Sequence, residues 1–156
     1  MSKPSSTKSK EIKIITKHVV TLQDIEKDLR KIKLLYIMSE FGEISEKALQ
    51  YLLYEMKNKG YDLGYNFTVV GRVPTSKELF NDLIALKYTG LVETNAIRKL
   101  VISSLGREFL EKHSSKISDE EKNNIKNLIE ELRVKVKPID VEVEMMFKRG
   151  RRRKLV

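Results

Sequence analysis

The segment 86–110 constrains the fold of this chain more than any other, because the spacing of its apolar residues changes twice. Helical spacing ends at Gly90, a residue type that commonly follows the last turn of a helix. Residues 91–102 then hold two short β-forming runs, separated by a turn at 95–98. Helical spacing returns after Ser103, a preferred N-cap residue. This order predicts a helix, a β-hairpin and a second helix in immediate succession.

Three amphipathic helices are predicted ahead of this hairpin, because apolar residues recur there at every third or fourth position. They cover residues 23–41, 45–59 and 75–90. In the third helix, Thr75 and Glu78 have the spacing of a capping box, in which hydroxyl and carboxylate satisfy each other's backbone amides. Its predicted buried face consists of Leu79, Phe80, Leu83, Ile84 and Leu86.

The remaining elements are predicted from shorter signals. The connection 60–74 reads as a loop with one short strand, and residues 11–20 as an edge strand. A helix begins after Ser118 and ends at Pro138, because proline breaks helices. Residues 141–145 alternate apolar and charged side chains, which predicts a strand.

The composition disfavours several classes of protein. The 156 residues include no cysteine, which removes disulfides, thiolate metal sites and cysteine nucleophiles. The two histidines are far apart, and no phosphate-binding loop follows the glycines. We therefore expect no enzymatic activity, no metal and no cofactor. No apolar run has membrane-spanning length and no signal peptide is evident, so we expect a cytoplasmic, nucleoid-associated protein. The abundance of Lys, Glu and Ile is typical of thermophiles and hints at an archaeal source.

The net charge of +9 is concentrated at the two ends of the chain. Residues 1–20 hold five lysines and one glutamate, whereas the body, 21–147, is about neutral. The C-terminal cations are Lys148, Arg149, Arg151, Arg152, Arg153 and Lys154. A cationic arm gains affinity for a polyanion by releasing counterions. We therefore predict nucleic-acid binding by this tail; an acidic protein partner and simple solubility are the alternatives.

Two stretches resemble known winged-helix families. Leu86 to Glu93, followed by the hairpin and Ser103 to Leu110, resembles the L-x-x-x-G-L-[VI]-E … L-T-x-x-G-R-x-F-L stretch of PadR- and MarR-type regulators. Residues 47–93 also resemble SocA-type, phage-associated winged-helix proteins, although Gly71 to Pro74 departs from their Tyr-Gly-Pro turn. The resemblance implies an α+β, mainly α, winged helix-turn-helix with an added C-terminal helix and a basic tail. The implied parts are a basic, partly disordered arm at 1–20, the winged-helix domain at 21–113, a helix and strand at 114–147, and the tail at 148–156.

The resemblance implies that the third helix reads double-stranded DNA, as in a transcriptional regulator or a chromatin-associated factor. Its exposed positions are expected to be Ser76, Lys77, Asn81 and Ala85, where Asn81 suits an adenine edge and Lys77 a phosphate or guanine. Arg98 and Lys99 at the hairpin tip, and Arg72 in the preceding loop, are further candidates for nucleic-acid contacts. RNA is an alternative polymer, since the tail would bind either.

The C-terminal helix also carries a partner prediction. PadR-type proteins dimerise through such a helix, so the resemblance implies a homodimer. The expected contact residues are Ile125, Leu128, Ile129 and Leu132. The alternative is that this helix folds back on its own body.

A second hypothesis makes the fold a protein-interaction adaptor in a replication, transcription or antitoxin-like complex. Its contact surface would be the aromatic loop 61–70. The neutral body favours this hypothesis, as do Glu78 and Asp82, which would repel phosphate from the third helix.

Overall fold

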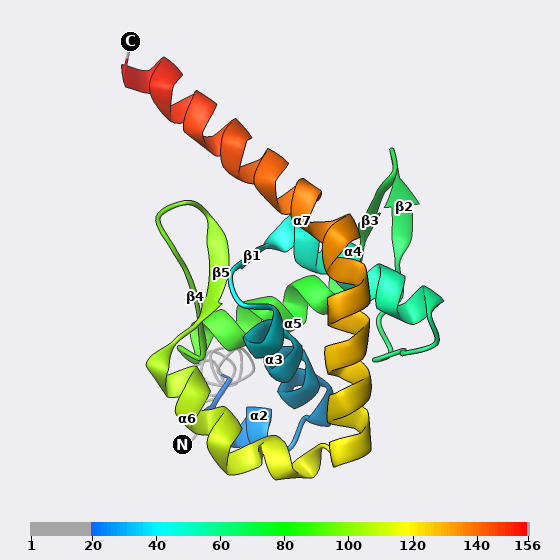
Figure 1. Ribbon diagram of the computed structural model, residues 1–156. Helices are drawn as coiled ribbons and strands as arrows, with labels where there is room; N and C mark the ends of the chain where they lie inside the picture. Colours follow the sequence, from blue (N-terminus) through cyan, green and yellow to red (C-terminus); the bar gives the residue numbers. More distant parts are fainter. Residues whose placement is uncertain (1–19, 156) are drawn as a thin grey trace, which may run out of the picture.

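The computed structural model describes residues 20–155, and the side chains of residues 20–150 (Figure 1). The predicted arm at 1–20, with its edge strand, therefore lies almost wholly outside the described residues. The chain is an α+β protein, mainly helical, as predicted. Its elements are α2 (Leu22–Glu26), α3 (Leu29–Phe41), β1 (Ile44–Ser45), α4 (Glu46–Asn58), β2 (Thr68–Val70), β3 (Val73–Thr75), α5 (Lys77–Tyr88), β4 (Val92–Thr94), β5 (Lys99–Ile102), α6 (Ser104–His113), the 3-10 turn Ser114–Lys116 and α7 (Asp119–Leu155).

The first predicted helix is divided into α2 and α3. Thr21 caps α2 through a capping box with Asp24, as its side chain allows. Helix α2 ends at Glu26, with Lys27 as its C-cap, because Asp28 adopts an extended backbone and becomes a second N-cap that accepts from the amide of Lys31. The prediction of one helix over 23–41 was therefore wrong at this break, whereas its end at Phe41, followed by Gly42 as C-cap, is confirmed.

The predicted hairpin 91–102 is confirmed and joins a third strand. Strands β4 and β5 pair antiparallel, with Glu93 opposite Val101. The short β1 pairs with the other edge of β5, with Ile44 opposite Leu100. The sheet order β1-β5-β4 thus attaches the hairpin to the connection between α3 and α4.

A second hairpin occupies the connection in which one strand was expected. Strands β2 and β3 pair antiparallel around Gly71 and Arg72, and Val70 faces Val73. Both turn residues have positive φ, 57° and 71°, as a two-residue type I′ turn requires. Figure 1 shows this hairpin projecting from the body.

Helix α7 differs most from the sequence-based expectation. It continues through Pro138 to Leu155, so the predicted end at Pro138 and the predicted strand 141–145 were both wrong. Figure 1 shows that the helix changes direction part-way along, where its C-terminal half leaves the body. Pro138 accounts for a bend, because its ring clashes with the carbonyl one turn earlier and it donates no hydrogen bond.

A single apolar core joins the helices to the three-stranded sheet. Its buried members come from α2 through α7, and Ile32, Leu49, Leu83 and Ile125 are fully enclosed. Helix α7 lies along α4 and contacts α3 as well. Within the part of the chain that the structure describes, no helix is long and apolar enough to cross a membrane.

Candidate nucleic-acid interface

The outward face of α5 is defined by six exposed side chains. They recur at helical spacing on the side opposite the core: Lys77, Phe80, Asn81, Ile84, Lys87 and Tyr88. Lys77 and Asn81 are exposed as predicted. Ser76 and Ala85 are buried instead, 3% and 8% exposed. Phe80 and Ile84, predicted to be core residues, are 47% and 48% exposed.

Ser76 is buried because it is the N-cap of α5. Its side chain accepts from the amide of Leu79, so Ser76 and not Thr75 is the N-cap of α5. Thr75 belongs to β3, where its hydroxyl donates to the carbonyl of Thr68. The amide of Ser76 is held in turn by Gln50 of α4. The helix therefore begins one residue later than the capping box predicted.

Asp82 of α5 is turned into the protein, where it is satisfied by two other elements. The guanidinium of Arg30 donates twice, from Nε at 2.8 Å and from Nη2 at 3.1 Å. The phenol of Tyr65 donates to the same carboxylate at 2.7 Å, and Arg30 also lies over the Tyr65 ring. Burial and the bond to Asp82 raise the pKa of Tyr65 above its usual value. Asp82 is therefore no obstacle to an anion on the outward face.

Glu78, the other carboxylate of α5, is engaged beside the helix start. It accepts from the amide of Asn66 at 3.0 Å and from the hydroxyl of Ser76 at 3.1 Å. These bonds, the Asn66 amide first, lower the pKa of Glu78, so it remains ionised but faces the loop before β2. The six exposed side chains that define the outward face thus include two lysines and no carboxylate.

The tip of the β4–β5 hairpin is less available than predicted. Lys99 is 4% exposed, and its ammonium lies among Asp140 at 3.0 Å, Glu144 at 2.9 Å and Glu43 at 3.7 Å. Burial alone would lower the pKa of Lys99, but the carboxylates of Glu144 and Asp140 outweigh it and raise the pKa. The prediction that Lys99 contacts nucleic acid was wrong, because its charge is neutralised inside the protein.

Arg98 remains at the surface but has a partner. Its guanidinium lies 5.4 Å from the centre of the Phe147 ring, a cation–π contact between the hairpin and α7. Arg72 is exposed at the turn of the β2–β3 hairpin. The structure therefore leaves Arg72 and Arg98 at the tips of two different hairpins.

The basic C-terminal residues belong to a helix and not to an irregular tail. Lys148 and Arg149 are exposed on α7, and Lys148 pairs with Glu144 one turn earlier at 3.0 Å. Residues 151–154 continue the same helix, and their side chains lie outside the described residues. Because Asp140, Glu144 and Phe147 contact the β4–β5 hairpin, that hairpin sets the direction in which the basic end points.

The aromatic loop 61–70 contributes mainly to the interior. Tyr65 is 1% exposed, and the hydroxyl of Tyr61 donates to Glu121 of α7 at 2.7 Å. Tyr54 and Phe67 meet edge to face. The exposed apolar residues of this region are Val69 and Val70, on β2. Sequence reasoning could not foresee that the loop joins α5 to α7.

The residues predicted to dimerise are buried within the chain itself. Ile125, Leu128, Ile129 and Leu132 are at most 9% exposed. They belong to the apolar core where α7 packs along α4 and α3. This stripe is therefore not available to a second copy, and the alternative that the helix folds back on its own body is the one observed.

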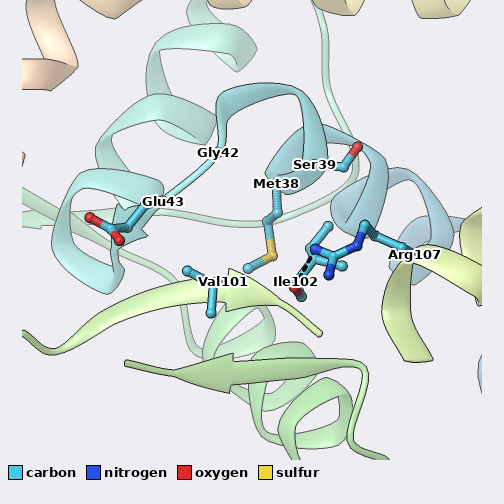
Figure 2. Close-up of a pocket in the computed structure, with 7 residues that line it drawn as sticks. All are labelled: Met38, Ser39, Gly42, Glu43, Val101, Ile102 and Arg107. Atoms are coloured by element: carbon cyan, nitrogen blue, oxygen red, sulfur yellow. Dashed lines mark hydrogen bonds between the residues drawn. The ribbon is translucent and has the colours of Figure 1, made fainter. Parts of the chain in front are cut away.

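A shallow pocket of about 210 Å³ lies between the end of α3, strand β5 and α6 (Figure 2). Met38, Val101 and Ile102 form an apolar surface, with Arg107 and Glu43 at its edges. Figure 2 shows the guanidinium of Arg107 donating to the carbonyl of Ile102, at 3.2 Å. Glu43 accepts from Asn95 at 2.7 Å. Both charged groups are thus already partnered, so the pocket offers a ligand mainly its apolar floor.

No protein-family model, no curated protein and no solved structure matches this chain. The resemblance to winged-helix regulators therefore stays a prediction from its motifs.

Proposed function

We propose that this chain is a winged-helix protein that binds double-stranded DNA through the outward face of α5. The order of elements supports the fold: α3, β1, α4, α5 and the β4–β5 hairpin follow one another, and β1 pairs with β5. In a helix-turn-helix unit the second helix of the motif lies in the major groove. Helix α5 occupies that position in the chain order.

The observation that carries the proposal is that neither carboxylate of α5 lies on its outward face. Asp82 is bound by Arg30 and Tyr65, and Glu78 is bound by the loop before β2. The outward face then combines Lys77, which suits a phosphate or a guanine, with Asn81, which suits an adenine edge. Asp82, whose charge is paired inside the protein, is therefore no objection to DNA on this face, and the bonds of Glu78 hold it beside the helix start.

The basic end of α7 supplies the sequence-independent part of the proposed binding. Lys148 and Arg149 are exposed, and the residues after them extend the helix. Contacts of such cations with phosphates make the affinity depend steeply on salt. The proposed activity is that of a DNA-binding regulator or chromatin-associated factor, with no reaction catalysed.

The test is a fluorescence-anisotropy titration of a duplex at several salt concentrations. Asn81→Ala is expected to lower the affinity for a preferred sequence by roughly tenfold, because a bidentate base contact contributes about 1–3 kcal/mol. The paired change Lys148→Ala and Arg149→Ala is expected to reduce the salt slope by about 0.9 for each phosphate that is no longer neutralised. Lys112→Ala, an exposed lysine on α6, is the control. Unchanged binding in both variants would refute the proposal; a preference for RNA would redirect it to that polymer.

A protein-interaction adaptor is the second candidate, and one observation favours it. Phe80, Ile84 and Tyr88 repeat every four residues along α5 and are 47%, 48% and 63% exposed. Such an apolar ridge suits a protein groove. Affinity capture after nuclease treatment separates the candidates: a partner that no longer binds Phe80→Ala but still binds Asn81→Ala supports the adaptor.

A further inference from the structure

Helix α7 has two apolar faces, and its own chain covers only one of them. The buried face follows Ile125, Leu132 and Val136 towards the core. A second series, Val134, Pro138, Val141 and Met145, lies about half a turn away, because an α-helix has 3.6 residues per turn. Val134, Val141 and Met145 are 77%, 43% and 54% exposed. This series is called the outer seam below.

The outer seam has the spacing of a coiled-coil contact. Its members follow one another at intervals of four, three and four residues, which is the alternation of core positions in a heptad repeat. Figure 1 shows that the C-terminal half of α7, which carries most of the seam, extends away from the body. The seam is therefore accessible along its length to another helix.

The charged residues at the ends of the seam fit a second copy of α7 that runs in the opposite direction. Continuing the same heptad by one position places Glu131 before Val134 and Lys148 after Met145. Two copies side by side in the same direction would bring Glu131 against Glu131 and Lys148 against Lys148. Two copies in opposite directions bring each Glu131 against a Lys148, and each Val134 against a Met145.

We propose that two copies of this chain pair through the outer seams of α7 in an antiparallel arrangement. Pro138 then faces Val141 on either side of the two-fold axis, and a Glu131–Lys148 pair closes each end. Within one chain, Glu131 contacts Lys59 and Lys148 contacts Glu144. Both are contacts between exposed groups, which contribute little and rearrange at small cost. The dimer surface is thus opposite the stripe predicted from the sequence.

The oligomeric state of the full chain, without DNA, tests this directly and independently of nucleic-acid binding. Sedimentation is expected to give about twice the chain mass of 18.2 kDa. Val141→Asp is expected to weaken association by at least about tenfold, because the change buries an unpaired charge. Val70→Asp is the matched control, since Val70 is exposed on β2 and far from the seam in sequence. A monomeric wild-type chain, or a dimer unaffected by Val141→Asp, would overturn the proposal.

Orientation is tested by cross-linking and by charge reversal. The chain contains no cysteine, so a single introduced thiol reports one contact. A mixture of Val134→Cys and Met145→Cys chains is expected to form the mixed disulfide, whereas Val134→Cys alone remains uncross-linked. Lys148→Glu is expected to weaken the dimer, and adding Glu131→Lys to the same chain to restore it. Efficient cross-linking of Val134→Cys to itself, or no effect of Lys148→Glu, would overturn the antiparallel arrangement.

Discussion

Lys99 of β5 and Asp140 of α7 form a buried ion pair, with Nζ of Lys99 3.0 Å from Oδ2 of Asp140. The other oxygen of Asp140 accepts from the amide of Ser45 at 2.6 Å, and the Ser45 hydroxyl caps α4. One carboxylate thus connects α7, the β4–β5 hairpin and the start of α4. The ion pair lies two residues after Pro138, where helical geometry is needed to direct Asp140 and Glu144 to the same lysine.

Removing the ammonium of Lys99 is expected to destabilise the protein strongly. In Lys99→Met, the fully buried Asp140 loses its positive partner, and an unpaired buried charge costs about 3–5 kcal/mol. Urea unfolding followed by circular dichroism measures the change. Lys47→Met removes the exposed contact of Lys47 with Glu142 and is expected to change stability by less than about 1 kcal/mol. Equal changes in the free energy of unfolding for the two variants would show that the ion pair of Lys99 does not stabilise the fold.

Acid is expected to weaken the ion pairs of Lys99 through protonation of Glu144. Lys99 first, and then Lys148, lower the pKa of Glu144 from 4.5 to about 2. A carboxylate with a depressed pKa stabilises the fold above its ordinary pKa, and this contribution is lost as the pH falls towards 2. The difference in unfolding free energy between the wild type and Glu144→Gln should therefore be constant near neutral pH and shrink below pH 4.5. A difference that does not depend on pH would contradict this assignment.

The phenol of Tyr65 is expected to stabilise the fold up to alkaline pH. Burial, and then the hydrogen bond to Asp82, raise its pKa above 10, so its contribution is present below pH 10 and is lost as the pH rises beyond that. Tyr65→Phe is expected to cost about 1.5 kcal/mol at neutral pH, as for a hydrogen bond to a charged group. Tyr54→Phe is the control, because it removes no hydrogen bond among the described side chains. Its free energy of unfolding is expected to differ from that of the wild type by less than about 0.5 kcal/mol. Chemical denaturation of both variants gives the comparison.

Close packing at Gly106 forbids a larger residue. A Cβ atom there would collide with the carbonyl oxygen of Leu91 and approach Cγ2 of Ile102 to 2.6 Å. Gly106→Ala is therefore expected to lower the free energy of unfolding by about 1–3 kcal/mol. Gly150→Ala is the control, because a Cβ at Gly150 meets no atom within 4 Å. In a helix this control change is expected to be neutral or stabilising by up to about 1 kcal/mol. Thermal unfolding measures the stability of both variants.

The orientation of α5 shows where periodicity misleads. Phe80 and Ile84 have the spacing of a buried stripe, and hydrophobicity alone assigns them to the core. The structure places them outside because Asp82, a polar residue, is drawn inwards by Arg30 and Tyr65. Neither partner is near Asp82 in the sequence, so no local pattern contains this information. The exposure of Lys77 and Asn81 was predicted correctly.

The sequence by itself determined the features that depend on neighbouring residues. Ser45 and Ser103 cap their helices, Gly42 ends α3, and the hairpin 91–102 forms where the apolar spacing changes. Caps and tight turns are satisfied by groups within a few residues, so their signals are local.

Only the tertiary structure decided the course of α7 and the burial of Lys99. Local preference ends the helix at Pro138 and makes 141–145 a strand. Asp140, Glu144 and Phe147 instead find partners on the β4–β5 hairpin, and these contacts favour a helix through the proline. The physical reason is that a buried charge needs a partner, wherever that partner lies in the chain. The free-energy cost of leaving the charge unpaired is larger than the local conformational preferences of individual residues.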